Sequence, residues 1–172
     1  MTSSAVIDPT GRYRYSLTRH WGPGPGPLVC WVMLNPSTAD ADRNDPTITR
    51  CIALSTAWGF RGLVVVNLFG WRATKPADLM NAPNPVGPEN DQAIRRALRD
   101  GNVLQVIAAW GAHADRDWIA HRVTVVTHLL RHEADLRFRC ELSHIGLTKG
   151  GHPRHPLYVR GDVLPQPWRP RG

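Results

Sequence analysis

The sequence predicts an α/β protein, a three-layer α/β/α sandwich. Its central sheet is expected to be mostly parallel and four-stranded, with one additional N-terminal edge strand. Short apolar runs rich in β-branched residues have the length and composition of buried strands. Stretches with apolar residues at helical spacing separate those runs. Because strand and helix alternate, crossover connections are required, and these produce parallel strands with helices on both faces.

The N-terminal part is expected to contribute two strands. Residues 1–11 are expected to be loose, and the alternating residues 13–19 predict an edge strand. The glycine- and proline-rich residues 21–27 turn the chain back, and the apolar residues 28–34 predict a buried strand. We therefore expect residues 13–19 and 28–34 to pair as a hairpin.

A helix and a central strand follow. Asp45 as the N-cap and Pro46 at the first helical position predict a helix that ends before Gly59. Residues 63–68, LVVVNL, have the β-branched composition of a strand buried on both faces. The residues expected on the inner face of the helix are Ile48, Cys51, Ile52 and Ser55.

The second half repeats this alternation. The expected elements are a loop over 73–88 with a short turn near 76–80, a helix from 87–91 to about 99, a strand over 103–109, a helix over 115–132, a strand over 137–144 and a loose tail over 161–172. The expected inward residues are Ala93, Ile94, Ala97, Leu98, Trp118, Ile119, Val123, Val126, Leu129 or Leu130, and, in the last strand, Phe138, Cys140 and Leu142.

Length and composition indicate one domain over residues 1–172, with a formal net charge of +7. Arginine supplies nearly all of the positive charge, which favours a polyanionic partner. The alternative is that the base composition of the coding sequence raises arginine, alanine and proline together. No apolar run has the length of a membrane span and no signal peptide is recognisable, so a cytoplasmic monomer without membrane contact is expected.

Neither a metal nor a cofactor is expected. The sequence contains no phosphate-binding glycine motif and no CxxC pair, and its histidines lack metal-ligand spacing. Cys30, Cys51 and Cys140 are far apart and odd in number, so they are interpreted as buried apolar residues rather than as disulfide partners.

Polar residues stand where four of the predicted strands end. Because the carboxyl ends of parallel strands meet at one edge of a sheet, and ligands bind there in open α/β sheets, one shared site is expected. The residues in these segments are Asn35, Pro36, Ser37, Thr38 and Asp40; Asn67, Phe69 and Arg72; Trp110 and Gly111; and Lys149 and His155.

Each of these residues has a functional and a structural interpretation. Asn35 can orient a water or bind a base edge, or it can simply end a strand. Asp40 can act as a base or cap a loop, and His155 can stabilise an anion or lie on the surface. Asn67, at the end of a central strand, needs a hydrogen-bonding partner, and a ligand is one candidate.

Two further features have the same two interpretations. Lys149 with Gly150 and Gly151 is either an anion-binding nest or an ordinary hairpin turn. One aromatic residue near the strand ends is expected to stack on a base, while the others belong to the core. The aromatic candidates are Trp58, Phe60, Phe69, Trp71 and Trp110.

The segments MLNPSTAD, GLVVVNLFGWRATKP, VIAAWG and LTKGGHPRHPLY carry a resemblance to a family. Over about residues 12–160, the chain resembles an uncharacterised family of bacterial and phage proteins of unknown function. This resemblance implies no chemistry.

The same motifs also resemble, more remotely, the uracil-DNA glycosylase superfamily, whose members are α/β/α sandwiches with a four-stranded parallel sheet. Leu34-Asn35-Pro36-Ser37 resembles the motif that holds the water-activating residue, and Val65-Val66-Asn67 the motif whose asparagine reads the uracil edge. Ala109-Trp110-Gly111 is similar to a third motif, and His155-Pro156-Leu157 to the last, whose histidine stabilises the departing uracil anion.

The resemblance implies hydrolysis of an N-glycosidic bond in nucleic acid, DNA rather than RNA, by an activated water. Met33 stands where glycine is usual, Ser37 stands where tyrosine or glycine is common, and the segment after His155-Pro156 lacks a second proline or serine. Since function often differs on a shared fold, two alternatives remain open. One is a non-catalytic module that binds nucleic acid or a nucleotide, and the other is an enzyme acting on a free or modified nucleotide.

Overall fold

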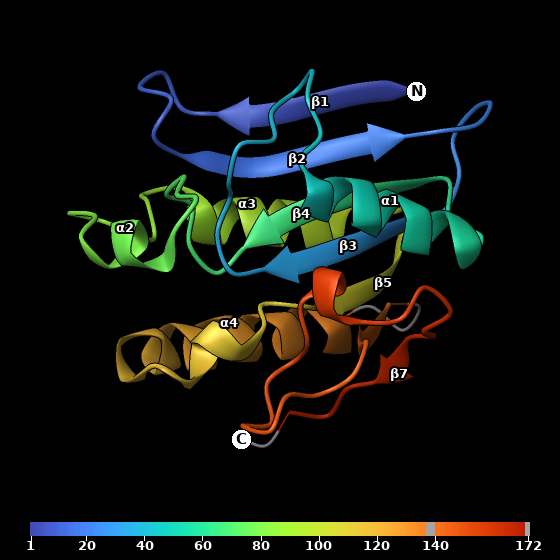
Figure 1. Ribbon diagram of the computed structural model, residues 1–172. Coiled ribbons are helices and arrows are strands. Elements are labelled where there is room, and N and C mark those ends of the chain that lie inside the picture. The colour runs from blue at the N-terminus through green and yellow to red at the C-terminus, as the bar shows by residue number, and fades with distance from the viewer. Residues whose placement is uncertain (137–139, 171–172) are drawn as a thin grey trace.

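The computed structural model describes residues 1–136 and 140–170. Its strands form one sheet in the order β1-β2-β4-β3-β5-β6-β7 (Figure 1). The strands are β1 (Thr2–Ile7), β2 (Arg14–His20), β3 (Leu28–Met33), β4 (Gly62–Asn67), β5 (Val103–Ala108), β6 (Glu141–His144) and β7 (Gln166–Pro167). The helices are α1 (Pro46–Ala57), α2 (Pro76–Met80), α3 (Asn90–Arg99) and α4 (Asp117–Asp135), with short 3-10 turns η1 (Ala112–Asp115) and η2 (Pro156–Tyr158).

The central strands β4, β3, β5 and β6 are parallel, as predicted. From β3 the chain passes to β4 on one side, and it then crosses to β5 on the other side. This reversal of direction creates a topological switch point at the carboxyl ends of β3 and β5. In doubly wound sheets, this is the position at which a ligand-binding crevice forms.

The outer strands differ from the prediction. β2 pairs antiparallel with β4 and not with β3, because β4 and β5 occupy both edges of β3. Residues 2–7, expected to be loose, form β1 against β2, so the N-terminal edge has two strands rather than one. Part of the tail is also ordered, since β7 pairs with β6 and Trp168 packs against Trp110.

The last predicted strand begins later than expected. β6 covers only Glu141–His144, and Cys140 precedes it. Phe138, with residues 137 and 139, lies outside the described residues, as do residues 171–172. Cys30 and Cys51 are buried, as predicted, and burial raises the pKa of both thiols.

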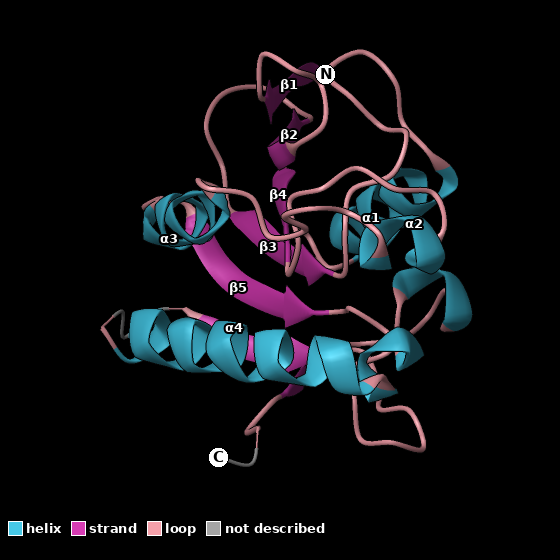
Figure 2. Ribbon diagram, turned by 90° about the vertical axis from the view of Figure 1, so that its left-hand side faces the viewer, coloured by secondary structure: helices cyan, strands magenta, loops and turns pink. Residues whose placement is uncertain are grey.

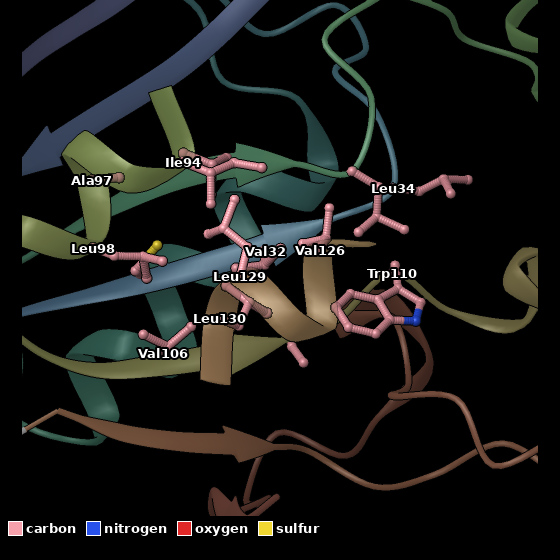
Figure 3. Close-up of a cluster of buried hydrophobic side chains, with 14 of the residues drawn as sticks. Val32, Leu34, Ile94, Ala97, Leu98, Val106, Trp110, Val126, Leu129 and Leu130 are labelled. Atoms are coloured by element: carbon pink, nitrogen blue, oxygen red, sulfur yellow. The ribbon is translucent and has the colours of Figure 1, made fainter. Parts of the chain in front are cut away.

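Helices cover both faces of the sheet (Figure 2). Alternate residues of β3 point to opposite faces, so Trp31 packs in the core beneath α1, and Val32 packs with Ile94 of α3 and Val126 of α4 (Figure 3). Each such aliphatic side chain contributes about 1.5–3 kcal/mol when it is buried. The three layers follow from the near-continuous apolar sequence of the central strands.

The N-terminus of α1 forms as predicted. Asp45 accepts a hydrogen bond from the backbone N–H of Ile48 at 2.8 Å, and Pro46 is the first helical residue. The inner face is slightly rotated from the prediction, since Leu54 is fully buried and Ile52 is only half-buried. This cap fixes the start of α1 beside the carboxyl end of β3.

Candidate functional site

A pocket of about 500 Å³ opens at the switch point of the sheet. Its walls come from the start of β2, from the segments that follow β3, β4 and β5, from the N-terminus of α1 and from the loop that precedes η2. The lining residues are Arg14, Met33, Leu34, Asn35, Ser37, Asp45, Thr47, Ile48, Ala73, Thr74, Trp110, Gly111, Ala112, His113, Thr148, Lys149, Arg154, His155 and Tyr158.

Three of the four predicted strand-end segments meet in this pocket. They contribute Asn35 and Ser37, Trp110 and Gly111, and Lys149 and His155. The remaining predicted residues, Pro36, Thr38, Asp40, Asn67, Phe69 and Arg72, are not among its lining residues.

Gly111 brings two of these segments into contact. Its φ of +80° belongs to a region that side chains rarely adopt, and a Cβ there would lie 3.2 Å from the Cβ of His155. Its N–H donates to the carbonyl of Pro153 at 2.8 Å. Glycine at this position therefore allows the His155 loop to close over the end of β5.

The side-chain amide of Asn35 has a fixed orientation. Its Nδ2 donates to the carbonyl oxygens of Pro36, at 3.0 Å, and Ala73, at 2.8 Å. Since both partners are acceptors, they identify the nitrogen, and Oδ1 is the remaining atom of the amide. That oxygen is an acceptor that can hold a water or the N–H of a ligand.

His155 is held as a neutral donor. Its Nδ1 accepts a hydrogen bond from the N–H of Leu157 at 3.3 Å, so the ring proton of the neutral form is on Nε2. Burial lowers the pKa of His155, the nearby His113 lowers it further, and Asp45 acts in the opposite direction. At neutral pH the ring therefore offers an Nε2–H, which can stabilise a developing anion.

Asn67 is completely buried, and neither Oδ1 nor Nδ2 has a hydrogen-bond partner within residues 1–136 and 140–170. In the sheet it is paired with Met33, which does line the pocket. The backbone carbonyl of Asn67 accepts a hydrogen bond from the side chain of Asn90. The sequence signal of an asparagine ending a central strand thus corresponds to an unsatisfied amide next to the pocket wall.

Asp40 and Arg72 hold the loop after β3. Asp40 Oδ1 accepts hydrogen bonds from the N–H groups of Asp42 and Arg43, each at 2.9 Å, and these bonds lower the pKa of Asp40. Arg72 donates to the carbonyls of Ser37 and Gly11. These contacts match the loop-capping interpretation of Asp40.

Three other predicted residues lie near the same loop. Phe69 is buried against Trp118, and Thr38 is exposed. Pro36 is buried, and its carbonyl accepts hydrogen bonds from Asn35 and Ala73.

Lys149 is exposed and begins a tight turn, in which the N–H of Gly151 donates to the carbonyl of Thr148. A Cβ on Gly150 would collide with Asp115, whose carboxylate also contacts His152. A carboxylate of the protein therefore already covers this turn, which favours the hairpin interpretation over an anion nest.

Of the five aromatic candidates, only Trp110 is among the residues that line the pocket. It is 1% exposed, and its Nε1 has no partner in the described part of the chain. Trp58 stacks on Trp31 and donates to the carbonyl of Val163, and Trp71 packs edge-on against Tyr13.

Several lining residues escaped the sequence-based prediction, above all Arg14. It is 1% exposed, although an arginine in an alternating edge strand is expected to face solvent. A shift of register between β1 and β2 near Arg14 interrupts the simple alternation, and no local sequence signal marks it. The other polar lining residues that were not predicted for the site are Asp45, Thr47, Thr74, His113, Thr148, Arg154 and Tyr158.

Within residues 1–136 and 140–170, no group of three or more His, Cys, Asp or Glu side chains is arranged to hold a metal ion. No helix in the same part of the chain is long and apolar enough to span a membrane.

The fold and the pocket define an α/β protein with a candidate ligand site at the topological switch point of its sheet. The chain belongs to the DUF1643 family, described as proteins of unknown function, whose family model matches residues 14–157. No curated protein and no solved structure matches the chain. The family match confirms the predicted resemblance to an uncharacterised family. The comparisons lend no support to the resemblance to uracil-DNA glycosylases.

Proposed function

We propose that the pocket binds a nucleotide unit and that the protein hydrolyses the bond between its base and its sugar, as uracil-DNA glycosylases do. The observation that carries this proposal is the convergence of Asn35, Trp110 and His155 on one pocket. At about 500 Å³, the pocket has a size typical of small-molecule sites. The net charge of +7 favours a phosphate-bearing partner.

Asn35 and His155 have complementary roles in this reaction. As the bond between sugar C1′ and the base nitrogen breaks, its electron pair leaves with the base, and the Nε2–H of His155 stabilises the resulting anion. A water held by Oδ1 of Asn35 adds to C1′, and its proton finally neutralises the departed base. An amide orients the water but takes no proton, so the step depends on stabilisation of the leaving group.

Asn67 receives no base-reading role in this proposal, because it does not line the pocket. Hydroxyl groups of Ser37, Thr47 and Thr74, which do line it, are among the neutral donors and acceptors available for a base edge.

A binding module without catalysis is the second candidate, and Met33 favours it. Met33 lines the pocket at the position where glycosylases usually have glycine, so its side chain occupies space beside Asn35. A ligand held at this wall would be kept farther from the water site.

The experiment measures release of free base, by chromatography with mass detection. The substrates are single- and double-stranded oligonucleotides containing uracil, hypoxanthine or alkylated bases, in DNA and RNA, and the corresponding free nucleotides. We expect release by the wild type and a decrease of at least about 100-fold in Asn35→Ala and His155→Ala. Asn81→Ala and His121→Ala, which change exposed residues outside the pocket, are the matched controls.

The outcomes separate the two candidates. Binding of nucleotides without release of base from any substrate overturns the glycosylase proposal and supports the binding module. If no nucleotide or oligonucleotide binds, both are overturned.

A further inference from the structure

Two buried arginines of β2 differ in how their charge is satisfied. Arg14 and Arg19 are each 1% exposed. The guanidinium of Arg19 donates to five acceptors, which are the side chain of Asn44 and the carbonyls of Ser4, Thr18, Asp40 and Arg43. Arg19 is thus an internal anchor for the loop after β3.

Among the described residues, the side chain of Arg14 has one hydrogen-bond acceptor. Its Nη1 donates to the carbonyl of Ala39 at 2.7 Å, and its Nε has no partner among residues 1–136 and 140–170. Within the same residues it forms no ion pair. Burial lowers the pKa of Arg14 to about 10, so the side chain remains charged at neutral pH. Asp45 and Asp40 act on this charge through space, but a buried charge without an ion pair is unfavourable unless an anion supplies the missing interaction.

The missing partner can reach Arg14 from the pocket, because Arg14 is one of its lining residues. The N-terminus of α1 borders the same space through Asp45, Thr47 and Ile48. The positive end of a helix favours anions, and a guanidinium matches a phosphate in a bidentate geometry.

The other charged groups of the pocket leave it positive. Lys149 and Arg154 are exposed lining residues and add two further positive charges. Asp45 is the only carboxylate among the described lining residues, and its Oδ1 already accepts the N–H of Ile48. An incoming anion therefore meets the positive charges of Arg14, Lys149 and Arg154. The single carboxylate of these described residues, that of Asp45, already caps the first turn of α1.

We propose that Arg14 and the N-terminus of α1 form a subsite for a terminal phosphate monoester, so that the ligand is a nucleoside monophosphate or a phosphorylated nucleic-acid end. The identity of the attached base rests on the proposed function. The phosphate is terminal because Arg14 is covered almost completely, and a group that contacts it must enter the pocket. A phosphodiester within a strand is bonded to a sugar on each side, so it cannot enter the pocket end-on. A monoester is bonded to one sugar only and can.

The experiment measures dissociation constants by calorimetric titration. The ligands are inorganic phosphate, ribose 5-phosphate, deoxynucleoside 5′-monophosphates with their nucleosides, and short oligonucleotides with and without a 5′-phosphate. We expect loss of the phosphate to weaken binding to the wild type at least tenfold, and Arg14→Gln to abolish that difference. Arg12→Gln, at an exposed arginine outside the pocket, is the matched control and retains it.

A measurement on the wild type guards against a folding defect of Arg14→Gln. Phosphate is expected to raise the melting temperature along a saturating curve, because it binds the folded state, whereas exclusion of phosphate from the protein surface gives a rise that does not saturate. Absence of this shift counts against the subsite. Arg14→Lys, which keeps the charge but loses the planar fork, is expected to bind the monophosphates more weakly than the wild type does.

The results distinguish this proposal from the proposed function. Nucleosides that bind as tightly as their monophosphates overturn the phosphate subsite and leave the proposed function standing. A phosphate dependence that persists in Arg14→Gln overturns the role of Arg14. If ribose 5-phosphate binds as well as every nucleotide, the subsite is supported and the nucleotide-specific function fails. Monophosphates and phosphorylated oligonucleotides are separate arms, so their relative affinities identify the source of the phosphate.

Discussion

Two regions of the molecule satisfy their polar groups in different ways. One is the contact between α3 and α4, and the other is the carboxyl edge of the sheet. Between the helices, the buried carboxylate of Glu133 accepts hydrogen bonds from Arg95 and Arg99 at 2.9–3.0 Å. Arg122 is similarly paired with Asp91 and with the carbonyl of Leu68.

At the sheet edge, several buried polar atoms lack partners. Within the described residues, all buried unpartnered side-chain atoms belong to Arg14, Asn67, Asn90 and Trp110. Asn67 ends β4, Trp110 follows β5, and Asn90 donates to the carbonyls of Asn67 and Leu68. Arg14 belongs to the same edge, because the antiparallel pairing sets the start of β2 beside the end of β4.

The polar groups of the helix contact are satisfied within the fold, whereas those of the sheet edge leave room for a ligand to satisfy them. Native proteins satisfy nearly all buried polar groups, so unsatisfied groups that gather at one edge call for a functional explanation.

Arg19→Met should destabilise the protein by about 3–5 kcal/mol, since several buried acceptors lose their donor. Arg14→Met, on the same strand, should cost less than about 1 kcal/mol, because it removes a charge that has one acceptor. Urea denaturation of both variants measures the difference. Equal losses of stability would show that Arg14 is an anchor like Arg19.

Glu133→Gln should reduce stability at pH 7 by about 2–3 kcal/mol, because hydrogen bonds to a buried charge are lost. The hydrogen bond from Arg99, more than that from Arg95, lowers the pKa of Glu133 against the opposing effect of burial. The stabilisation is therefore complete above the ordinary pKa of about 4.5 and is lost as pH falls through the lowered pKa. Denaturation between pH 7 and pH 3 should show the two proteins converging at the acid end; a constant difference would contradict this account.

Gly111→Ala should cost about 1–3 kcal/mol, because its φ of +80° becomes strained and the new Cβ presses on His155. The free energy of ligand binding should fall by more than the free energy of unfolding does, since the same displacement opens the pocket. Gly101→Ala is the control, because a Cβ there meets nothing within 4 Å. An unchanged dissociation constant in Gly111→Ala would mean that the His155 loop is not part of the site.

The smallest effect concerns the protonation of His155. Since burial lowers the pKa of His155, the neutral ring stabilises the fold above the ordinary value of about 6.5, and this contribution is lost as pH falls toward the lowered pKa. Base release should persist below pH 6.5 for the same reason. Titration of the imidazole by NMR measures the value directly, and a pKa at or above 6.5 would refute the neutral-donor role.

The central elements were predictable because their signals are local. Asp45 and Pro46 define the start of α1, and the β-branched run ending at Asn67 defines β4, which pairs parallel with β3. The meeting of Asn35 and Gly111 follows from one rule, that parallel strands end at the same edge, whereas His155 reaches the pocket on the loop between β6 and η2.

What sequence reasoning missed depends on distant contacts. The sequence of β1 has no local pattern that distinguishes a strand from a loose terminus, and these residues form a strand by pairing with β2. The burial of Arg14 requires the loop after β3 to cover it, as its bond to Ala39 shows. Asp40 was ambiguous for a similar reason, since only the folded loop reveals that its carboxylate caps Asp42 and Arg43.

The most direct test of the central claim is a map of backbone and side-chain NMR shifts on titration with a deoxynucleoside monophosphate. The largest changes are expected on the Gly111 amide, the Asn35 side chain, the His155 ring and the Nε–H of Arg14. Changes concentrated around Glu133 between α3 and α4, or no changes at saturating nucleotide, would contradict the claim that the edge of the sheet is the ligand site.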